Sequence, residues 1–248
     1  MAKPKKKKIL VTGGMGFIGH NVVRLLQSLK HDVQVVDALT SYGVTNKEEL
    51  EYLYNQRLTK INKKTQIYKI DIADSSLDQV FDSFKPDVVI HLASFPRQAT
   101  VRANPTEAAH TMCKGLVNVL DCCARHEVAK VLYASSSMVY GNFDDAKEDD
   151  QLNPSGSYSI WKIAGEELVK EYNRNTGLDY VIVRPTAVYG PMDVSDRVVS
   201  KFLISAMRDE TLNVNGADET LDFTFVDDCA TGIVLAGLGH TIGTYNIS

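Results

Sequence analysis

The chain has 248 residues, enough for one large α/β domain or for one domain with a small appendage. Hydrophobic residues make up 44% of it, mean hydropathy is −0.15, and no apolar run approaches the length of a membrane span, so we expect no membrane partner. Without the five lysines among residues 1–8 the formal charge falls from −4 to −9, and an acidic body argues against nucleic-acid binding.

The N-terminal segment and the cysteines bear on location. Met1–Lys8 lacks the apolar core of a secretory signal, so we expect a solvated leader to the first strand. The four cysteines have no metal-ligand spacing, and no histidine completes such a set. We therefore predict reduced, mostly buried thiols, no metal site and a cytoplasmic protein.

The first strand is followed by a glycine-rich turn and a helix. An apolar run at Lys8–Val11 precedes Thr12–Gly19, and a helical pattern follows at Asn21–Leu29. Glycines let the backbone approach a pyrophosphate, and a helix N-terminus offers free N–H groups and a positive dipole end. Asp37 closes the next apolar run at a distance that suits an adenosine ribose and disfavours the extra phosphate of NADP. These features predict an NAD site.

Strands and helices alternate along most of the chain, which predicts a Rossmann-type doubly wound parallel sheet covered on both faces. The expected strands are Lys8–Val11, Val33–Val36, Gln66–Ile70, Val88–His91, Lys130–Ala134 and Tyr180–Val183. The expected helices are Asn21–Leu29, Leu77–Phe84, Thr106–His126, Ser157–Asn175, Val198–Arg208 and Asp228–Leu238. The rhythm changes after Arg184. We therefore predict an NAD-binding domain over 1–184 and a small, incomplete substrate-binding region over 185–248, with segments that return to the first domain.

Ligands of such sheets bind at the carboxyl ends of the strands. Asp71 at one end suits the adenine amino group, and Leu92, Ala93 and Ser94 at another suit the pyrophosphate and nicotinamide ribose. The competing interpretation of each segment is an ordinary turn.

Tyr158 and Lys162 lie four residues apart, which places a phenol and an ammonium on one face of a helix. Lowering a tyrosine pKa of about 10 to neutrality requires about 4 kcal/mol. An ammonium ~6 Å away supplies roughly 2.8 kcal/mol at an effective dielectric of about 20, and an oxidised nicotinamide would supply much of the remainder. A serine hydroxyl from Ser135–Ser137, at the end of the preceding strand, would bond the same substrate oxygen. The alternative is a serine-rich turn beside an exposed amphipathic helix.

In order along the chain stand TGGMGFIG, VVD, DVVIHLAS, YASSSMVYG, YSIWK, RPTAVYGP and LDFTFVDD. In this series the chain resembles the extended short-chain dehydrogenase/reductase family, in its nucleotide-sugar epimerase/dehydratase branch. The resemblance implies that Ser136, Tyr158 and Lys162 are catalytic. The residues expected to contact NAD are Gly13, Gly16, Phe17, Ile18, Gly19, Asp37, Asp71, Ile72, Leu92, Ala93, Ser94, Ser135, Tyr158, Lys162 and Pro185.

The resemblance also implies a first step in which Tyr158, ionised with help from Lys162, removes the C4 hydroxyl proton of a nucleotide sugar while hydride passes to NAD. Dehydratases of this branch carry an acidic pair directly after the serine or threonine, where this chain has Ser137 and Met138. We therefore expect a 4-epimerase of a UDP-hexose or its uronate, acting through a 4-keto sugar. A homodimer through the two long helices, Thr106–His126 and Ser157–Asn175, is expected from the family alone.

Alternatives remain open at this point. Another enzyme of the branch (a reductase, a decarboxylase or, less in keeping with Ser137 and Met138, a 4,6-dehydratase) would use the same first residues. A non-catalytic NAD-binding scaffold is the second class, because Met112 and Leu221 stand where relatives carry asparagine and arginine. The chain also stops at Ser248, where family members continue, so that it is either a compact form or a fragment. Arg197, Lys201 and Arg208 are candidates for the nucleotide phosphates.

Overall fold

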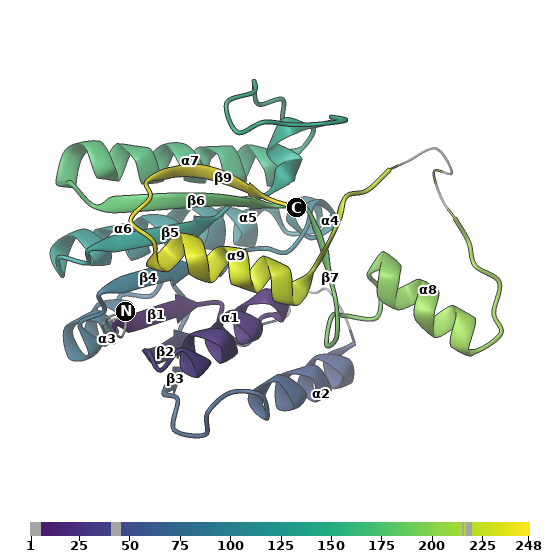
Figure 1. Ribbon diagram of the computed structural model, residues 1–248, viewed down its shortest axis with the longest axis horizontal. Coiled ribbons are helices and arrows are strands. Elements are labelled where there is room, and N and C mark those ends of the chain that lie inside the picture. Colours follow the sequence, from purple (N-terminus) through teal and green to yellow (C-terminus); the bar gives the residue numbers. More distant parts are fainter. Residues whose placement is uncertain (1–5, 41–45, 215, 217–219) are drawn as a thin grey trace, which may run out of the picture.

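A computed structural model describes residues 6–40, 46–214, 216 and 220–248. The first five residues of the expected leader lie outside this described part. One seven-stranded parallel sheet dominates the fold, in the order β3-β2-β1-β4-β5-β6-β9 (Figure 1). The strands are β1 (Lys8–Thr12), β2 (Asp32–Val36), β3 (Ile67–Tyr68), β4 (Val88–His91), β5 (Lys130–Ala134), β6 (Asp179–Pro185) and β9 (Gly243–Ile247).

Helices cover both faces of the sheet, as the strand–helix alternation predicts. On one face α1 (Phe17–Ser28) packs against α9 (Val226–Leu238), and their apolar side chains form one core with the strands. On the other face α3 (Leu77–Phe84), α6 (Leu116–Arg125) and α7 (Ser157–Thr176) form a second core. The strands are apolar along both faces because each face is buried. The doubly wound Rossmann-type fold is thus confirmed.

The long helix expected over Thr106–His126 is built from three consecutive pieces. They are α5 (Pro105–Ala109), the π-helical turn η1 (His110–Gly115) and α6. Two further helices were not predicted from the sequence, α2 (Lys47–Leu58) and α4 (Gln98–Ala103). Charged and amide side chains fill most of α2, and it buries only Leu53 and Arg57, so it shows no apolar stripe to detect.

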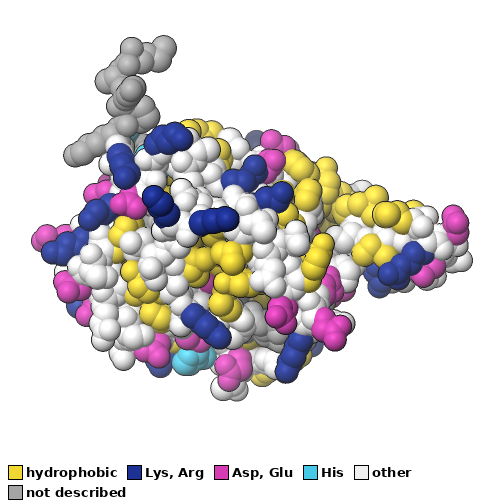
Figure 2. Space-filling view, turned by 90° about the horizontal axis from the view of Figure 1, so that it is seen from below, with side chains coloured by type: hydrophobic (Ala, Val, Ile, Leu, Met, Phe, Trp, Pro, Cys, Tyr) yellow, Lys and Arg dark blue, Asp and Glu magenta, His cyan; other side chains and the backbone are white. Residues whose placement is uncertain are grey.

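The segment after residue 185 is divided between the sheet and a projecting part. β9 lies beside β6, with Ile182 opposite Thr244, and α9 belongs to the core. Between them, β7 (Ala187–Tyr189) and β8 (Phe223–Phe225) form a small parallel pair. Helix α8 (Val198–Met207) points away from the sheet and buries none of its residues (Figure 1). Hydrophobic side chains run along this projection in Figure 2, and Leu203 and Met207 are exposed there.

No helix in the described part of the chain is both long enough and apolar enough to span a membrane.

Candidate active site

The glycine turn between β1 and α1 is tightly folded against a neighbouring strand end. Gly13 has φ +69°, a conformation that favours glycine, and its N–H donates to the Val36 carbonyl at 2.8 Å. A Cβ on Gly13 would lie 2.7 Å from the backbone nitrogen of Ala93. A Cβ on Gly19, in the first turn of α1, would collide with the Gly13 carbonyl oxygen. The turn therefore requires glycine, and it leaves the start of α1 open to a ligand.

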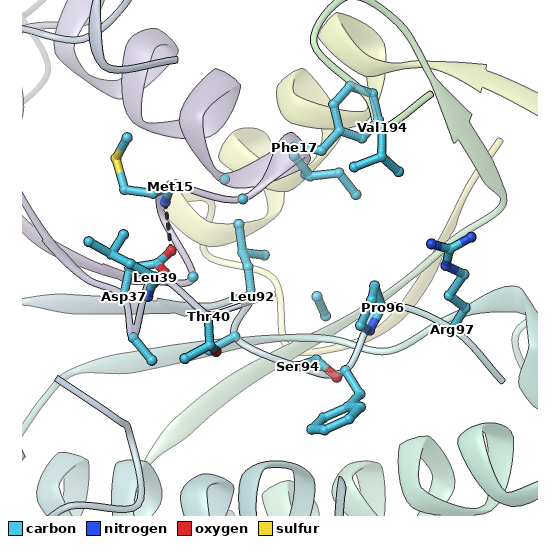
Figure 3. A pocket seen from close by; sticks show the side chains of 18 of the residues that line it. Met15, Phe17, Asp37, Leu39, Thr40, Leu92, Ser94, Pro96, Arg97 and Val194 are labelled. Atoms are coloured by element: carbon cyan, nitrogen blue, oxygen red, sulfur yellow. Dashed lines mark hydrogen bonds between the residues drawn. The ribbon is translucent and has the colours of Figure 1, made fainter. Parts of the chain in front are cut away.

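Asp37 follows β2 and faces this turn. Its carboxylate accepts hydrogen bonds from the backbone N–H groups of Met15 and Leu39, both at 2.9 Å, and the first of these is drawn in Figure 3. Burial raises the Asp37 pKa, whereas the two N–H groups and the nearby Arg57 guanidinium oppose that rise. The carboxylate is thus held in place with lone pairs left for ribose hydroxyls.

A cavity of about 830 Å³ runs along the carboxyl ends of the strands. Asp37 lies at one side of the view in Figure 3 and Arg97 at the other. All the cofactor-binding residues predicted from the sequence line this cavity: Gly13, Gly16, Phe17, Ile18, Gly19, Asp37, Asp71, Ile72, Leu92, Ala93, Ser94, Ser135, Tyr158, Lys162 and Pro185. Their side chains and turns come from six strand ends and from α1 and α7.

Two serines among these residues differ in whether their hydroxyl groups are free to bind a ligand. The Ser94 hydroxyl is buried without a hydrogen-bond partner, which leaves it available to a ligand in the cavity. The Ser135 hydroxyl instead donates to the Glu166 carboxylate at 2.5 Å, so Ser135 presents its backbone rather than its hydroxyl.

Tyr158 and Lys162, from the first turns of α7, close the inner end of the cavity. Both side chains are buried, Tyr158 at 8% and Lys162 at 3% exposed. The Lys162 ammonium donates to the Ala134 carbonyl at 2.7 Å and lies 5.6 Å from the centre of the Tyr158 ring. Ser136, between β5 and the short helix η2 (Ser137–Tyr140), lies close enough to Tyr158 to lower its pKa, and its Oγ accepts the Met138 N–H at 3.2 Å. Ser135 lines the cavity, whereas Ser136 lies just outside its lining. The structure thus brings the three predicted catalytic side chains together.

Burial acts strongly on both titratable groups. It raises the Tyr158 pKa to about 12, against the Ser136 hydrogen bond and the Arg197 charge, which lower it. It lowers the Lys162 pKa to about 7, against the Glu166 carboxylate. The help that Lys162 gives to Tyr158 is therefore smaller than the sequence suggests, because a buried amine near pH 7 is only partly charged. Ionisation of Tyr158 then depends more on other positive charges in the cavity.

Gln98 of α4 binds the start of α7, a contact that sequence patterns did not indicate. Its side-chain oxygen accepts the N–H of Tyr158 at 2.8 Å, and its amide donates to the Ser157 hydroxyl at 3.2 Å. One orphan N–H at the start of α7 is satisfied in this way. A Cβ on Gly156, the residue before α7, would collide with the Gln98 side chain.

Arginines absent from the sequence-based prediction also line the cavity. Arg57 of α2 donates to the carbonyls of Met15 at 3.1 Å and Met192 at 2.7 Å, which ties the glycine turn to the segment before α8. Arg97 forms an ion pair of 2.8 Å with Asp196. No local motif surrounds these arginines, so only the fold reveals them.

The three candidates for phosphate contacts are separated by the structure. Arg197 lines the cavity and acts on Tyr158. Lys201 and Arg208, on and just after α8, are exposed and do not line it.

The cavity fits a dinucleotide on two observations made on this chain. No side chain caps α1 at Gly16, and Phe17, Ile18 and Gly19 line the cavity, so the backbone N–H groups at the start of this helix are available to a phosphate. The unpartnered Ser94 hydroxyl and the fixed Asp37 carboxylate stand further along the same cavity.

Comparisons with known proteins agree with this geometry. The model of the NAD dependent epimerase/dehydratase family matches residues 9–248. The chain is 32% identical to a putative UDP-glucose 4-epimerase of Methanocaldococcus jannaschii, over 92% of this chain and 72% of that protein. It is also 30% identical to a dTDP-glucose 4,6-dehydratase of Neisseria meningitidis, over 97% of this chain and 70% of that protein.

Among solved structures, UDP-glucuronic acid 4-epimerase from Bacillus cereus, in complex with UDP-glucuronic acid and NAD, superposes with a TM-score of 0.87. It is 29% identical, and the match covers 97% of this chain and 77% of that one. The family model, the relatives and the shared fold lead to one conclusion: the chain belongs to the NAD dependent epimerase/dehydratase family.

Proposed function

We propose that this chain epimerises a UDP-linked hexose or hexuronate at C4, with NAD as the cofactor. The observation that carries the proposal is the buried Tyr158 phenol in the wall of the cofactor cavity, with the Lys162 ammonium 5.6 Å from its ring centre and the Ser136 side chain beside it. NAD, when bound, supplies a hydride acceptor that can give the hydride back. Gly13 to Gly19, Asp37 and the strand-end residues would hold it.

In this proposal Tyr158 accepts the proton of the C4 hydroxyl and later returns it. Ser136 donates a hydrogen bond to the same oxygen and thereby orients it. Lys162, held by the Ala134 carbonyl, places its positive charge beside the phenol. The side chains of Phe95, Val101, Ala108 and Met112 pack with Tyr158 in an apolar cluster, which keeps water from the phenol.

Epimerisation is favoured over dehydration by the residues after Ser136. Loss of water across C5 and C6 requires groups that move protons there, and Ser137 and Met138 carry no acid. The cavity-lining acids in the described part are Asp37, Glu51, Asp71 and Asp193. None of these follows the catalytic serine. Turning a 4-keto sugar over in the site requires no further acid or base.

Positive charge beside Tyr158 supports an anionic, nucleotide-linked substrate. Arg197 lines the cavity near the phenol, and Arg97 lines it from the position just before α4. Both are held by aspartates, Arg197 by Asp193 at 3.7 Å and Arg97 by Asp196 at 2.8 Å. We assign Arg197 to the diphosphate. Arg197→Ala should raise KM for UDP-sugars about tenfold, the effect of losing about 1.4 kcal/mol of binding, whereas Arg208→Ala, outside the cavity, should leave KM unchanged.

An NMR time course with NAD and a panel of UDP-hexoses and UDP-hexuronates tests the function. We expect one sugar to give its C4 epimer without net NADH. A 4-keto-6-deoxy product would identify a dehydratase, and a lost carboxyl group would identify a decarboxylase. Sugars that all stay unchanged while NAD is bound would contradict the proposal and favour a non-catalytic NAD-binding scaffold. Tyr158→Phe is the matched control for background conversion.

A further inference from the structure

A buried ion pair lies directly behind the proposed catalytic residues. Glu166 is fully buried, at 0% exposed, and Arg184 is 2% exposed. Two hydrogen bonds join them, from Arg184 Nε to Oε1 at 2.9 Å and from Arg184 Nη2 to Oε2 at 2.6 Å. Burying two charges costs much of their hydration free energy, so a gain in stability does not by itself explain why this pair lies here.

The pair is held by a network that reaches the edge of the sheet. The Ser135 hydroxyl donates to Glu166 at 2.5 Å. Arg184 also donates to the Tyr140 hydroxyl at 2.6 Å, and Tyr140 in turn donates to the Asn246 side chain of β9 at 2.8 Å. Every group in this chain of contacts has a partner, which fixes the carboxylate in one position.

Glu166 follows Lys162 by four residues on α7, so the two side chains share one face of the helix. Lys162 is also faced by Tyr158 of α7, by Tyr133 of β5 at 5.3 Å from its ring centre, and by His91 of β4. His91 is neutral because burial, helped by the Lys162 charge, lowers its pKa to about 3. Within the described part, Glu166 is the carboxylate that acts on Lys162.

We propose that Glu166, clamped by Arg184, is a positioning residue that keeps the Lys162 ammonium charged beside Tyr158. The inference rests on the proposed roles of Tyr158 and Lys162. Burial alone favours the neutral amine, and a neutral amine cannot stabilise a phenolate. The fixed carboxylate offsets that preference without touching the substrate, since Glu166 does not line the cavity.

The test measures the Lys162 titration in the protein without cofactor or substrate. Urea unfolding is followed from pH 5 to pH 9 in the wild type, in Glu166→Gln and in the double variant Glu166→Gln/Arg184→Met, each with and without Lys162→Met. The difference in unfolding free energy within each pair of proteins reports the proton bound by Lys162, because all other groups cancel.

The slope of this difference against pH rises from zero to its full value as the folded protein releases the Lys162 proton. We expect the midpoint of that rise near pH 7 in the wild type and about 1 pH unit or more lower in Glu166→Gln, the effect of a neighbouring opposite charge. The double variant keeps no unpaired guanidinium. It should also titrate at lower pH than the wild type, because Glu166 rather than Arg184 acts on Lys162. If Glu166→Gln does not fold, the double variant provides the test of whether Glu166 acts on Lys162.

An unchanged midpoint in the variants that fold would overturn the inference, since a purely structural pair would lower stability at every pH and leave the midpoint in place. The readout needs no turnover. A protein that fails to convert UDP-sugars but shows the shifted midpoint would refute the proposed function and leave the role of Glu166 intact.

Discussion

Burial of Lys162 should give the protein a specific pH dependence of stability. Its pKa falls from 10.5 in the unfolded chain to about 7 in the folded protein. Between these values the unfolded chain binds a proton that the folded protein has released, so stability rises with pH. The destabilisation is therefore complete below about pH 7 and disappears as the pH approaches 10.5.

The magnitude follows from the same two values. Between pH 7 and pH 9 the unfolded chain keeps its Lys162 proton and the folded protein goes from half-protonated to nearly deprotonated. At about 1.36 kcal/mol per pKa unit, the wild type gains about 2 kcal/mol relative to Lys162→Met over this interval. The hydrogen bond to the Ala134 carbonyl is lost in the variant at both pH values, and it cancels from the comparison.

Urea unfolding at pH 7 and pH 9 measures this change. Lys170→Met is the control, because Lys170 lies on the same helix with its ammonium paired to Glu167 at the surface. This control should show no such pH-dependent difference from the wild type. Parallel pH dependences for the wild type and Lys162→Met would refute the reasoning, since Lys162 would then carry the same charge in both states.

The remaining predictions concern the cofactor, the base and the assembly. Tyr158→Phe should abolish turnover and leave NAD affinity unchanged in a binding titration; turnover near wild type would remove Tyr158 from the mechanism. Asp37→Ala should weaken NAD binding about tenfold and relax the preference over NADP, and equal affinities before and after would show that Asp37 does not contact the ribose. Gly13→Ala should abolish NAD binding or folding, because its Cβ meets backbone at 2.7 Å, whereas Gly177→Ala, at φ +77° with nothing within 4 Å, should cost about 1 kcal/mol in unfolding. Light scattering should show the homodimer expected from the family, and a monomer would contradict that expectation.

Local patterns predicted the sheet well because each buried strand is a short apolar run between turns. The end strand β3 is shorter than the predicted Gln66–Ile70, since only Ile67 and Tyr68 pair with β2. Strand β9 was missed. Gly243–Ile247 mixes glycine, threonine and asparagine, and its place beside β6 is set by tertiary packing.

The cofactor site was more predictable than the substrate end. Glycine spacing and strand-end positions identify a phosphate site because backbone geometry and sheet topology dictate them. Arg57, Arg97 and Gln98 lie in segments without a motif, on or directly before the two helices that were not predicted from the sequence. The low pKa of Lys162 could not be predicted either, because it depends on burial by side chains distant in the sequence.

The division into two domains stays a prediction. The residues after 185 form the projecting helix α8, but they also form strand β9 of the sheet and helix α9, which packs on the sheet. The boundary at residue 185 therefore marks a change in the sequence pattern and does not separate two hydrophobic cores.

In a 4-epimerase of the proposed kind, hydride leaves C4 of the sugar and returns to the same carbon. Once the substrate has been found, a UDP-sugar that carries deuterium at C4 reports this transfer. We expect the C4 epimer to retain the deuterium at C4, with none released to water and none at other carbons. Deuterium that appears at another carbon of the sugar, or that is lost from the product, would refute a hydride transfer to and from C4.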